Sequence, residues 1–228
     1  MFSKDSFDNS FDGLSYYSQL KEKLTEYDLD IYDMFIHDVN QLGYKIKYIQ
    51  EIKALPDMDI KRIAPIIIKY DMKFLDLMTN NEMILLIGRK CMNLYSDYLL
   101  TEFCKPNIYY KENVFNFSRR WALSNTIIAI KDKSKIREYI CIIENEKLSK
   151  DSIFFIIQLS KWKVDDFIIP LKRLLTNESY EVRVAAVDGL CRYHDIELLD
   201  DILSLSNDAN QYVRRAVKSA EKKLSKLK

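Results

Sequence analysis

Few residues of this chain have the type and spacing that metal or nucleophilic chemistry requires. Cys191 and His194 would place a thiol and an imidazole one helical turn apart. A tetrahedral zinc site needs further ligands, but His37 is the only other histidine and no two cysteines have the Cys-x-x-Cys spacing. We therefore expect no metal, no cofactor and no catalytic residue. We interpret the cysteines as buried free thiols in apolar helical segments; they are Cys91, Cys104, Cys141 and Cys191.

A second candidate centres on Trp162, which lies between Lys161 and Lys163 and shortly before Asp165 and Asp166. Base-flipping enzymes combine aromatic side chains with a carboxylate in a basic groove. A DNA-binding enzyme of the alkylated-base glycosylase type, using either tryptophan of the chain, is therefore the alternative hypothesis. The simpler interpretation is that the two carboxylates cap the start of a helix.

The elements that must position any such site are repeated near the C-terminus. Residues 168–190 recur as residues 199–221 with a shift of 31, and the motif Val-Arg-x-Ala stands at the same place in both copies. Apolar residues recur at spacings of three and four, so each copy predicts two amphipathic helices joined by a short polar turn. Such a hairpin cannot bury its apolar face alone and must stack on a neighbour.

The same period extends upstream, because Arg120 stands two periods before Arg183 with the same Arg-x-Ala spacing. We expect an all-α chain of about five or six hairpins, with less regular pairs in the N-terminal half. The expected helix pairs are 14–27 with 29–43, 59–71 with 80–94, 95–106 with 112–130, 134–145 with 147–160, 164–176 with 179–192, and 195–205 with 209–224.

This pattern resembles the HEAT-repeat family. The resemblance is carried by Leu171-x-x-Leu174-Leu175-x-Asn177 followed by Val182-Arg183-x-Ala185, and by the second copy. The chain is also similar to bacterial HEAT-repeat proteins of uncharacterised role. The resemblance implies a right-handed α-α superhelix, the ARM/HEAT-type solenoid, in which a turn Asp or Asn and an Arg six residues later form a hydrogen-bonded ladder between repeats. It implies a structural ladder of Asn177, Arg183, Asp208 and Arg214.

In solenoids of this kind the second helix of each hairpin lines the concave side. Positions that the repeat makes equivalent form a stripe beside the core positions, aromatic near both ends, apolar in the middle and charged toward the C-terminus. Such a surface suits a protein or peptide better than a phosphate backbone. Packing between repeats is the other interpretation of its apolar members. The candidate partner-binding residues are Trp121, Asn125, Ile153, Glu181, Val184, Asp188, Tyr212 and Arg215.

The composition indicates which partners and which cellular location to expect. The chain of 228 residues has a formal net charge of +1 and 48% hydrophobic residues, so it has no global attraction to nucleic acid or anionic membranes. No apolar stretch reaches the roughly 20 residues of a membrane span. The first residues also do not have the basic start and apolar run of a signal peptide. We expect a cytoplasmic protein with no membrane partner.

Three regions are predicted along the chain. We expect residues 1–12 to be disordered, residues 13–110 to form a divergent helical N-terminal part or cap, and residues 111–228 to form HEAT-like repeats with a capping C-terminal helix. A cap is expected because the open end of a solenoid must be covered. The basic residues of the last helix, Arg214 and Lys218 among them, are interpreted as its solvated face.

These expectations predict a non-enzymatic protein-binding module or adaptor. One specific form is a small bacterial immunity or antidefence factor that neutralises a partner protein. The glycosylase-type alternative would need a basic concave wall, whereas Glu181 and Asp188 would repel phosphate. We therefore expect a protein or peptide partner, with nucleic acid as the less favoured one.

Overall fold

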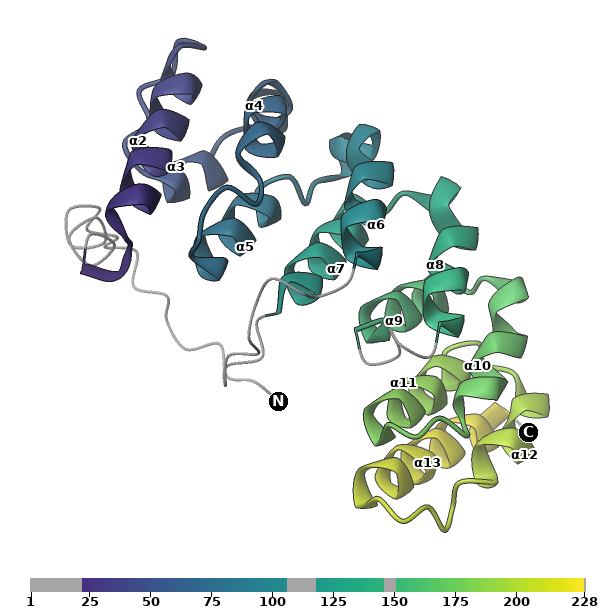
Figure 1. Ribbon diagram of the computed structural model, residues 1–228. Coiled ribbons are helices and arrows are strands. Elements are labelled where there is room, and N and C mark those ends of the chain that lie inside the picture. The colour runs from purple at the N-terminus through teal and green to yellow at the C-terminus, as the bar shows by residue number, and fades with distance from the viewer. Residues whose placement is uncertain (1–21, 106–117, 146–150, 228) are drawn as a thin grey trace. The chain divides into compact units, whose positions relative to one another are not determined.

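The computed structural model of this chain describes residues 22–105, 118–145 and 151–227. Within these ranges the secondary structure is helical, with no β-strand, as Figure 1 shows. The all-α class that the repeats predict is therefore confirmed. None of the helices in the described ranges has the length and apolar composition that crossing a bilayer requires. The predicted disorder of residues 1–12 lies outside the described residues.

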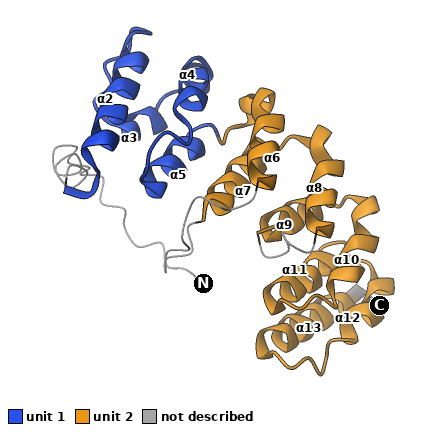
Figure 2. Ribbon diagram, viewed as in Figure 1, with its two compact units in different colours: residues 1–87 blue, residues 88–228 orange. Residues whose placement is uncertain are grey.

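The chain divides into two compact units, residues 1–87 and residues 88–228 (Figure 2). The first unit contains α2 (Glu26–Asn40), α3 (Ile49–Lys53), α4 (Asp57–Tyr70) and α5 (Leu77–Leu85). The α-helices of the second unit are α6 (Ser96–Cys104), α7 (Arg119–Ile130), α8 (Ile136–Glu144), α9 (Ile153–Trp162), α10 (Ile168–Leu174), α11 (Tyr180–Cys191), α12 (Leu199–Leu203) and α13 (Gln211–Leu224). The 3-10 turns in its described residues are η1 (Lys90–Tyr95), η2 (Lys133–Lys135), η4 (Asp165–Phe167), η5 (Ile196–Leu198) and η6 (Ser225–Leu227). The division lies upstream of the predicted boundary after residue 110, because α6 packs against α7.

The first unit is built around the contact of α2 with α4. The rings of Phe35 and Tyr70 meet edge to face at 5.6 Å, and both side chains are fully buried. At the edge of this core, the Tyr70 hydroxyl and the Lys69 ammonium donate to the same carboxylate oxygen of Asp38, at 2.9 and 2.7 Å. These two bonds hold the pKa of Asp38 below its usual range. The carboxylate therefore stays charged and ties the two helices together.

Two predicted helix boundaries in this unit are wrong. α2 continues through Asp28, where a break between helices was predicted, because the buried Asp28 carboxylate accepts from the Thr25 hydroxyl at 3.0 Å and from the Leu75 backbone N–H at 2.6 Å. The predicted helix 80–94 is interrupted, since α5 ends at Leu85 and Arg89 has an extended backbone. The apolar run before Arg89 hid this interruption in the sequence.

The described residues of the second unit form four hairpins, α6 with α7, α8 with α9, α10 with α11, and α12 with α13. They occupy the four segments predicted for the C-terminal half, with first helices shorter than predicted because a 3-10 turn precedes each of them. The second helices pack on one another in the order α7, α9, α11, α13, and the first helices lie on their other side (Figure 1). We call α7, α9, α11 and α13 the second-helix row.

Gly189 lies where α11 closely approaches α9 and α10. A Cβ atom at this position would lie 2.7 Å from Ser160 Oγ on α9 and 2.9 Å from Leu171 Cδ2 on α10. Neither neighbour moves easily, because the Ser160 hydroxyl donates to the Ile156 carbonyl at 2.8 Å and Leu171 is fully buried. The missing side chain therefore lets α11 sit against both helices.

We predict that Gly189→Ala destabilises the second unit. Alanine gains about 1 kcal/mol of helix propensity over glycine, but overpacking a closed core costs about 1–3 kcal/mol, so we expect a net loss of about 1–2 kcal/mol. Urea unfolding followed by tryptophan fluorescence measures it, because both tryptophans lie in this unit.

The control for this prediction is Ser219→Ala, at an exposed position of α13. The double variant Ser160→Ala/Gly189→Ala should lose less stability than the two single variants together, because it removes the Oγ atom that the new methyl group meets. Full additivity would contradict the proposed clash.

Candidate functional site

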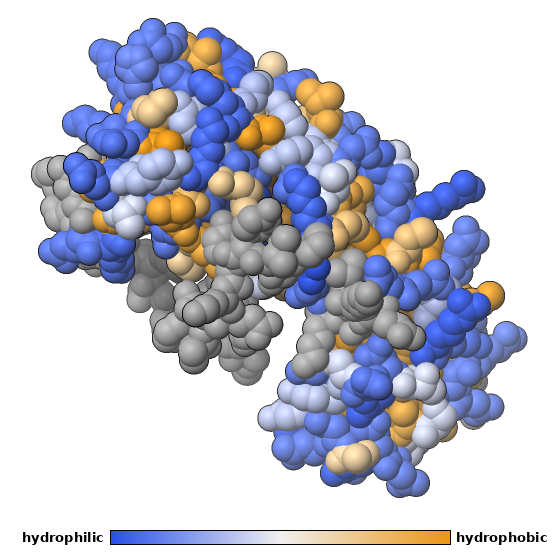
Figure 3. Space-filling model, viewed as in Figure 1, coloured by the Kyte–Doolittle hydropathy of each residue, from blue (hydrophilic) through white to orange (hydrophobic). Residues whose placement is uncertain are grey.

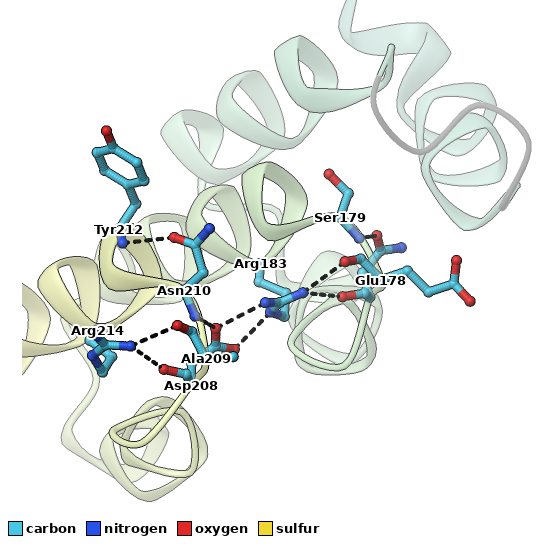
Figure 4. Close-up of polar contacts among 9 residues, drawn as sticks. Glu178, Ser179, Arg183, Asp208, Ala209, Asn210, Tyr212 and Arg214 are labelled. Carbon is cyan, nitrogen blue, oxygen red and sulfur yellow. Dashed lines mark hydrogen bonds and ion pairs between the residues drawn. The ribbon is translucent and has the colours of Figure 1, made fainter.

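Arg183 joins the last two hairpins through its guanidinium group (Figure 4). Nε and Nη2 donate to the two carboxylate oxygens of Asp208, at 2.8 and 2.9 Å. Nη1 donates to the backbone carbonyls of Asn177 and Glu178, at 2.8 and 2.9 Å. Asp208 lies in the turn before α13 and the two carbonyls lie in the turn before α11, so one side chain connects two successive turns.

This ion pair is shielded from water. The exposed fraction of the side chain is 15% for Arg183 and 7% for Asp208. Asp208 Oδ1 also accepts from the backbone N–H of Asn210 at 2.8 Å. The hydrogen bonds from Arg183, above all, hold the pKa of Asp208 below its usual range. A bidentate, charge-assisted pair of this kind is stronger and more directional than a neutral hydrogen bond.

The ladder does not continue from Asn177 to α9. Asn177 Oδ1 accepts from the Ser179 backbone N–H at 2.9 Å, so its side chain closes its own turn and is not bonded to an arginine of the hairpin before. The residue that corresponds to Arg183 by the repeat is Ser152, which is buried directly before α9 and has no guanidinium group to form such a bidentate bond. Among the predicted ladder residues, the bond between hairpins is therefore Arg183 with Asp208.

A second bond between hairpins lies upstream, where the sequence analysis did not place it. Arg120 Nη1 donates to Asp151 Oδ2 at 3.0 Å, while Nε and Nη2 donate to the carbonyls of Phe103 and Lys105 at 3.2 and 3.0 Å. Arg120 thus connects the end of α6 to the start of α9. The search for an acid six residues before each arginine missed Asp151, although the 31-residue separation from Arg120 was visible in the sequence.

The C-terminal part of the second-helix row presents an aromatic pair. The rings of Tyr180 and Tyr212 stack with centroids 6.0 Å apart and planes at 23°, and the Arg215 guanidinium carbon lies 5.8 Å from the Tyr212 centroid. Tyr180 and Tyr212 are 37% and 52% exposed, and Arg215 is exposed. The sequence analysis missed Tyr180 because it stands 32 residues before Tyr212, one more than the repeat.

Acidic and apolar groups surround this pair. Glu181 accepts from the Ser179 hydroxyl at 2.6 Å and raises the pKa of the Tyr180 hydroxyl. Val184 is half-buried on the next turn of α11. Asp188 is an exposed residue whose carboxyl pKa is raised by desolvation, against the opposing charges of Lys223 and Arg192. The surface is therefore of mixed charge.

The upstream candidate residues lie deeper. Trp121 and Asn125 on α7 and Ile153 on α9 are all half-buried. Asn125 Nδ2 donates to the Trp121 carbonyl at 2.8 Å, so this amide is bonded to its own helix. All eight candidates thus stand on the second-helix row, and the exposed ones are on α11 and α13. The face of the second unit displayed in Figure 3 is largely hydrophilic, with scattered apolar residues.

Of the Trp162 cluster, only the tryptophan is half-buried, and the lysines and aspartates around it are exposed. The indole lies 6.3 Å from the buried Tyr139 ring, and Lys133 Nζ lies 5.6 Å from the indole centroid. Asp165 and Asp166 are exposed at the start of η4. Trp162 therefore packs α9 against α8 through Tyr139. The carboxylates of Asp165 and Asp166 are exposed to solvent.

The cysteines differ from the predicted buried thiols. Cys191 is buried, which raises the pKa of its thiol, but Cys104 and Cys141 are exposed and Cys91 is half-buried. These helices are amphipathic, and a cysteine next to the apolar stripe falls on the solvent side. No group of three or more metal-ligating side chains occurs in the described ranges.

Comparison of the sequence with models of known protein families finds no match, and comparison with curated proteins finds none either.

We predict that Arg183→Lys destabilises the second unit more than Arg214→Lys does. Lysine keeps the charge but cannot form the bidentate bond, so we expect a loss of about 2–3 kcal/mol at Arg183. Within the described residues, Arg214 donates to two carbonyls of its own turn, at 2.6 and 2.9 Å, and to no carboxylate, so its replacement should cost about 1 kcal/mol. Urea unfolding of both variants measures the difference, and equal losses would refute it.

Measuring stability over a range of pH isolates the contribution of the Asp208 carboxylate to the free energy of unfolding. Because its folded-state pKa is depressed, its contribution to stability is present above the unfolded-state pKa of about 3.9 and is lost as the pH falls through the lower folded-state pKa. The stability difference between wild type and Asp208→Asn should therefore be constant near neutral pH and shrink below about pH 4. Asp200→Asn, at an exposed position of α12, is the matched control.

Proposed function

We propose that this chain is a HEAT-type solenoid that binds a protein or peptide partner along the second-helix row and catalyses no reaction. The observation that carries the proposal is the exposed Tyr180–Tyr212 stack with Arg215 beside it. A protein that uses aromatic side chains only for its core buries them, as it does with Phe155 and Tyr139 here. Exposed tyrosines held rigid by stacking make good binding anchors, because little side-chain entropy is lost on association.

The ladder supports the solenoid part of this proposal. Arg183 with Asp208 and Arg120 with Asp151 each connect one hairpin to a later one, so that the second helices pack in chain order. A regular stack of hairpins produces an extended surface without a deep pocket, which is typical of proteins that bind other chains.

The charges of the row favour a protein partner over nucleic acid. Arg215 lies on the same row as Glu181 and Asp188, so a polyanion would meet both attraction and repulsion. A protein surface can present both charges together with an apolar group for the tyrosines. Neutralisation of a partner, as by a bacterial immunity or antidefence factor, is one specific form that such binding could take.

The proposal predicts that Tyr212→Ala/Arg215→Glu loses the partner. Tagged full-length protein is used to capture binding partners from a lysate of the source organism, and mass spectrometry identifies what is retained. We expect a stoichiometric protein with wild type and at least a tenfold lower recovery with the variant, since loss of two interface anchors costs more than about 1.4 kcal/mol.

The matched control is Tyr27→Ala/Lys61→Glu, which likewise removes a tyrosine ring and reverses a positive charge, at exposed positions of α2 and α4. It should capture the partner as wild type does. Equal recovery with the Tyr212→Ala/Arg215→Glu variant would show that the row is not the binding surface. Recovery of nucleic acid that is released by salt would favour the glycosylase-type alternative.

A further inference from the structure

Arg214 repeats half of the arrangement of Arg183 (Figure 4). Its Nη1 donates to the carbonyls of Asp208 and Ala209, at 2.6 and 2.9 Å, as Nη1 of Arg183 does to the carbonyls of Asn177 and Glu178. The acceptors lie six and five residues before the arginine in both cases. The two guanidinium groups are therefore oriented in the same way by their own turns.

The other edge of the guanidinium differs between the two arginines. In Arg183 the Nε and Nη2 edge holds the carboxylate of Asp208. In Arg214 these two nitrogens have no acceptor within the part of the chain that the structure describes, and the residue is half-buried. Arg214 is thus a positioned, partly desolvated fork whose geometry matches a carboxylate.

A row of positive charge continues from this fork along α13. Lys218 and Lys222 follow Arg214 at intervals of four residues, so they share its side of the helix. At the equivalent positions of α11, four and eight residues after Arg183, stand the buried Val187 and Cys191. We call Arg214, Lys218 and Lys222 the end face.

The end face is not built to receive another apolar hairpin. α11 uses the corresponding side to join the hairpin that follows it, through Arg183 and through its packing on α13. On α13 the two apolar residues of that side are replaced by exposed lysines, and Glu221 beside them is the one exposed acid on this part of the described helix. In the described ranges α13 packs mainly against α11, α12 and η6.

We propose that the end face binds an acidic segment of a partner protein. One carboxylate of the segment, from an aspartate in a turn, is held by Nε and Nη2 of Arg214 as Asp208 is held by Arg183. Neighbouring acids of the segment lie against Lys218 and Lys222. The Arg183–Asp208 pair shows which chemical group this arginine geometry accepts, and charge complementarity supplies the rest. The proposal is independent of binding by the tyrosine pair.

The test is a titration of full-length protein, labelled with 15N, in which the arginine side-chain Nε–H signals are observed by NMR. The probe is a peptide with residues 205–210 of this chain followed by a run of glutamates, and the control peptide has asparagine in place of its aspartate. The Arg214 signal is assigned by its loss in Arg214→Lys. We expect a saturable shift of this signal with the aspartate peptide and about tenfold weaker binding of the control peptide.

Variants separate binding from folding. Lys218→Glu/Lys222→Glu leaves the contacts of Arg214 with its own turn intact and should reduce peptide affinity more than tenfold. Lys23→Gln/Lys47→Gln, at exposed positions of the first unit, should leave it unchanged. Binding by wild type should weaken as salt is raised.

Three results would overturn the proposal. The first is an Arg214 signal that stays in place up to about 5 mM peptide, where even a millimolar affinity is visible. The second is equal binding of the aspartate and asparagine peptides. The third is an oligothymidylate that binds the end face more tightly than the peptide does, which would assign the face to nucleic acid instead.

Discussion

Arg183 satisfies acceptors in two successive turns with a single planar group, and the placement of the last hairpin depends on it. Apolar contact between α11 and α13 is non-directional and does not by itself choose one register. The Arg183 guanidinium selects one register, because its Nε–H and Nη2–H groups meet the two carboxylate oxygens of Asp208 in only one arrangement. Gly189 sets the complementary limit, since its missing side chain fixes how closely α11 approaches its other neighbours.

The second-helix row and the end face differ in their chemistry. Along the second-helix row, stacked tyrosines stand among charges of both signs, which is a suitable surface for another protein. On α13, Arg214 has the same orientation as Arg183 but no carboxylate of the described chain, and lysines replace apolar residues beside it. The same local turn thus holds a hairpin in place at one position and, in our proposal, presents a binding group at the next.

The sequence predicted most where the repeat is regular. Helices α10 to α13 fall within the predicted segments, because apolar residues at spacings of three and four mark the buried side of each helix. In the first unit this signal is weaker. The two predicted helices 14–27 and 29–43 leave Asp28 between them, yet a buried carboxylate with a hydroxyl and a backbone N–H as partners can stand within a helix. The continuous apolar run before Arg89 concealed the end of α5.

The sequence by itself determined the helical class, the order of the C-terminal hairpins and the identity of the arginines at their turns, since these depend on spacings of a few residues. Only the tertiary structure decided which carboxylate each arginine meets: Arg183 has Asp208, Arg120 has Asp151, and Arg214 has none in the described ranges. It also decided that Tyr180 stacks on Tyr212. These pairings depend on how one hairpin is rotated on the next, and that rotation results from the packing of whole helices.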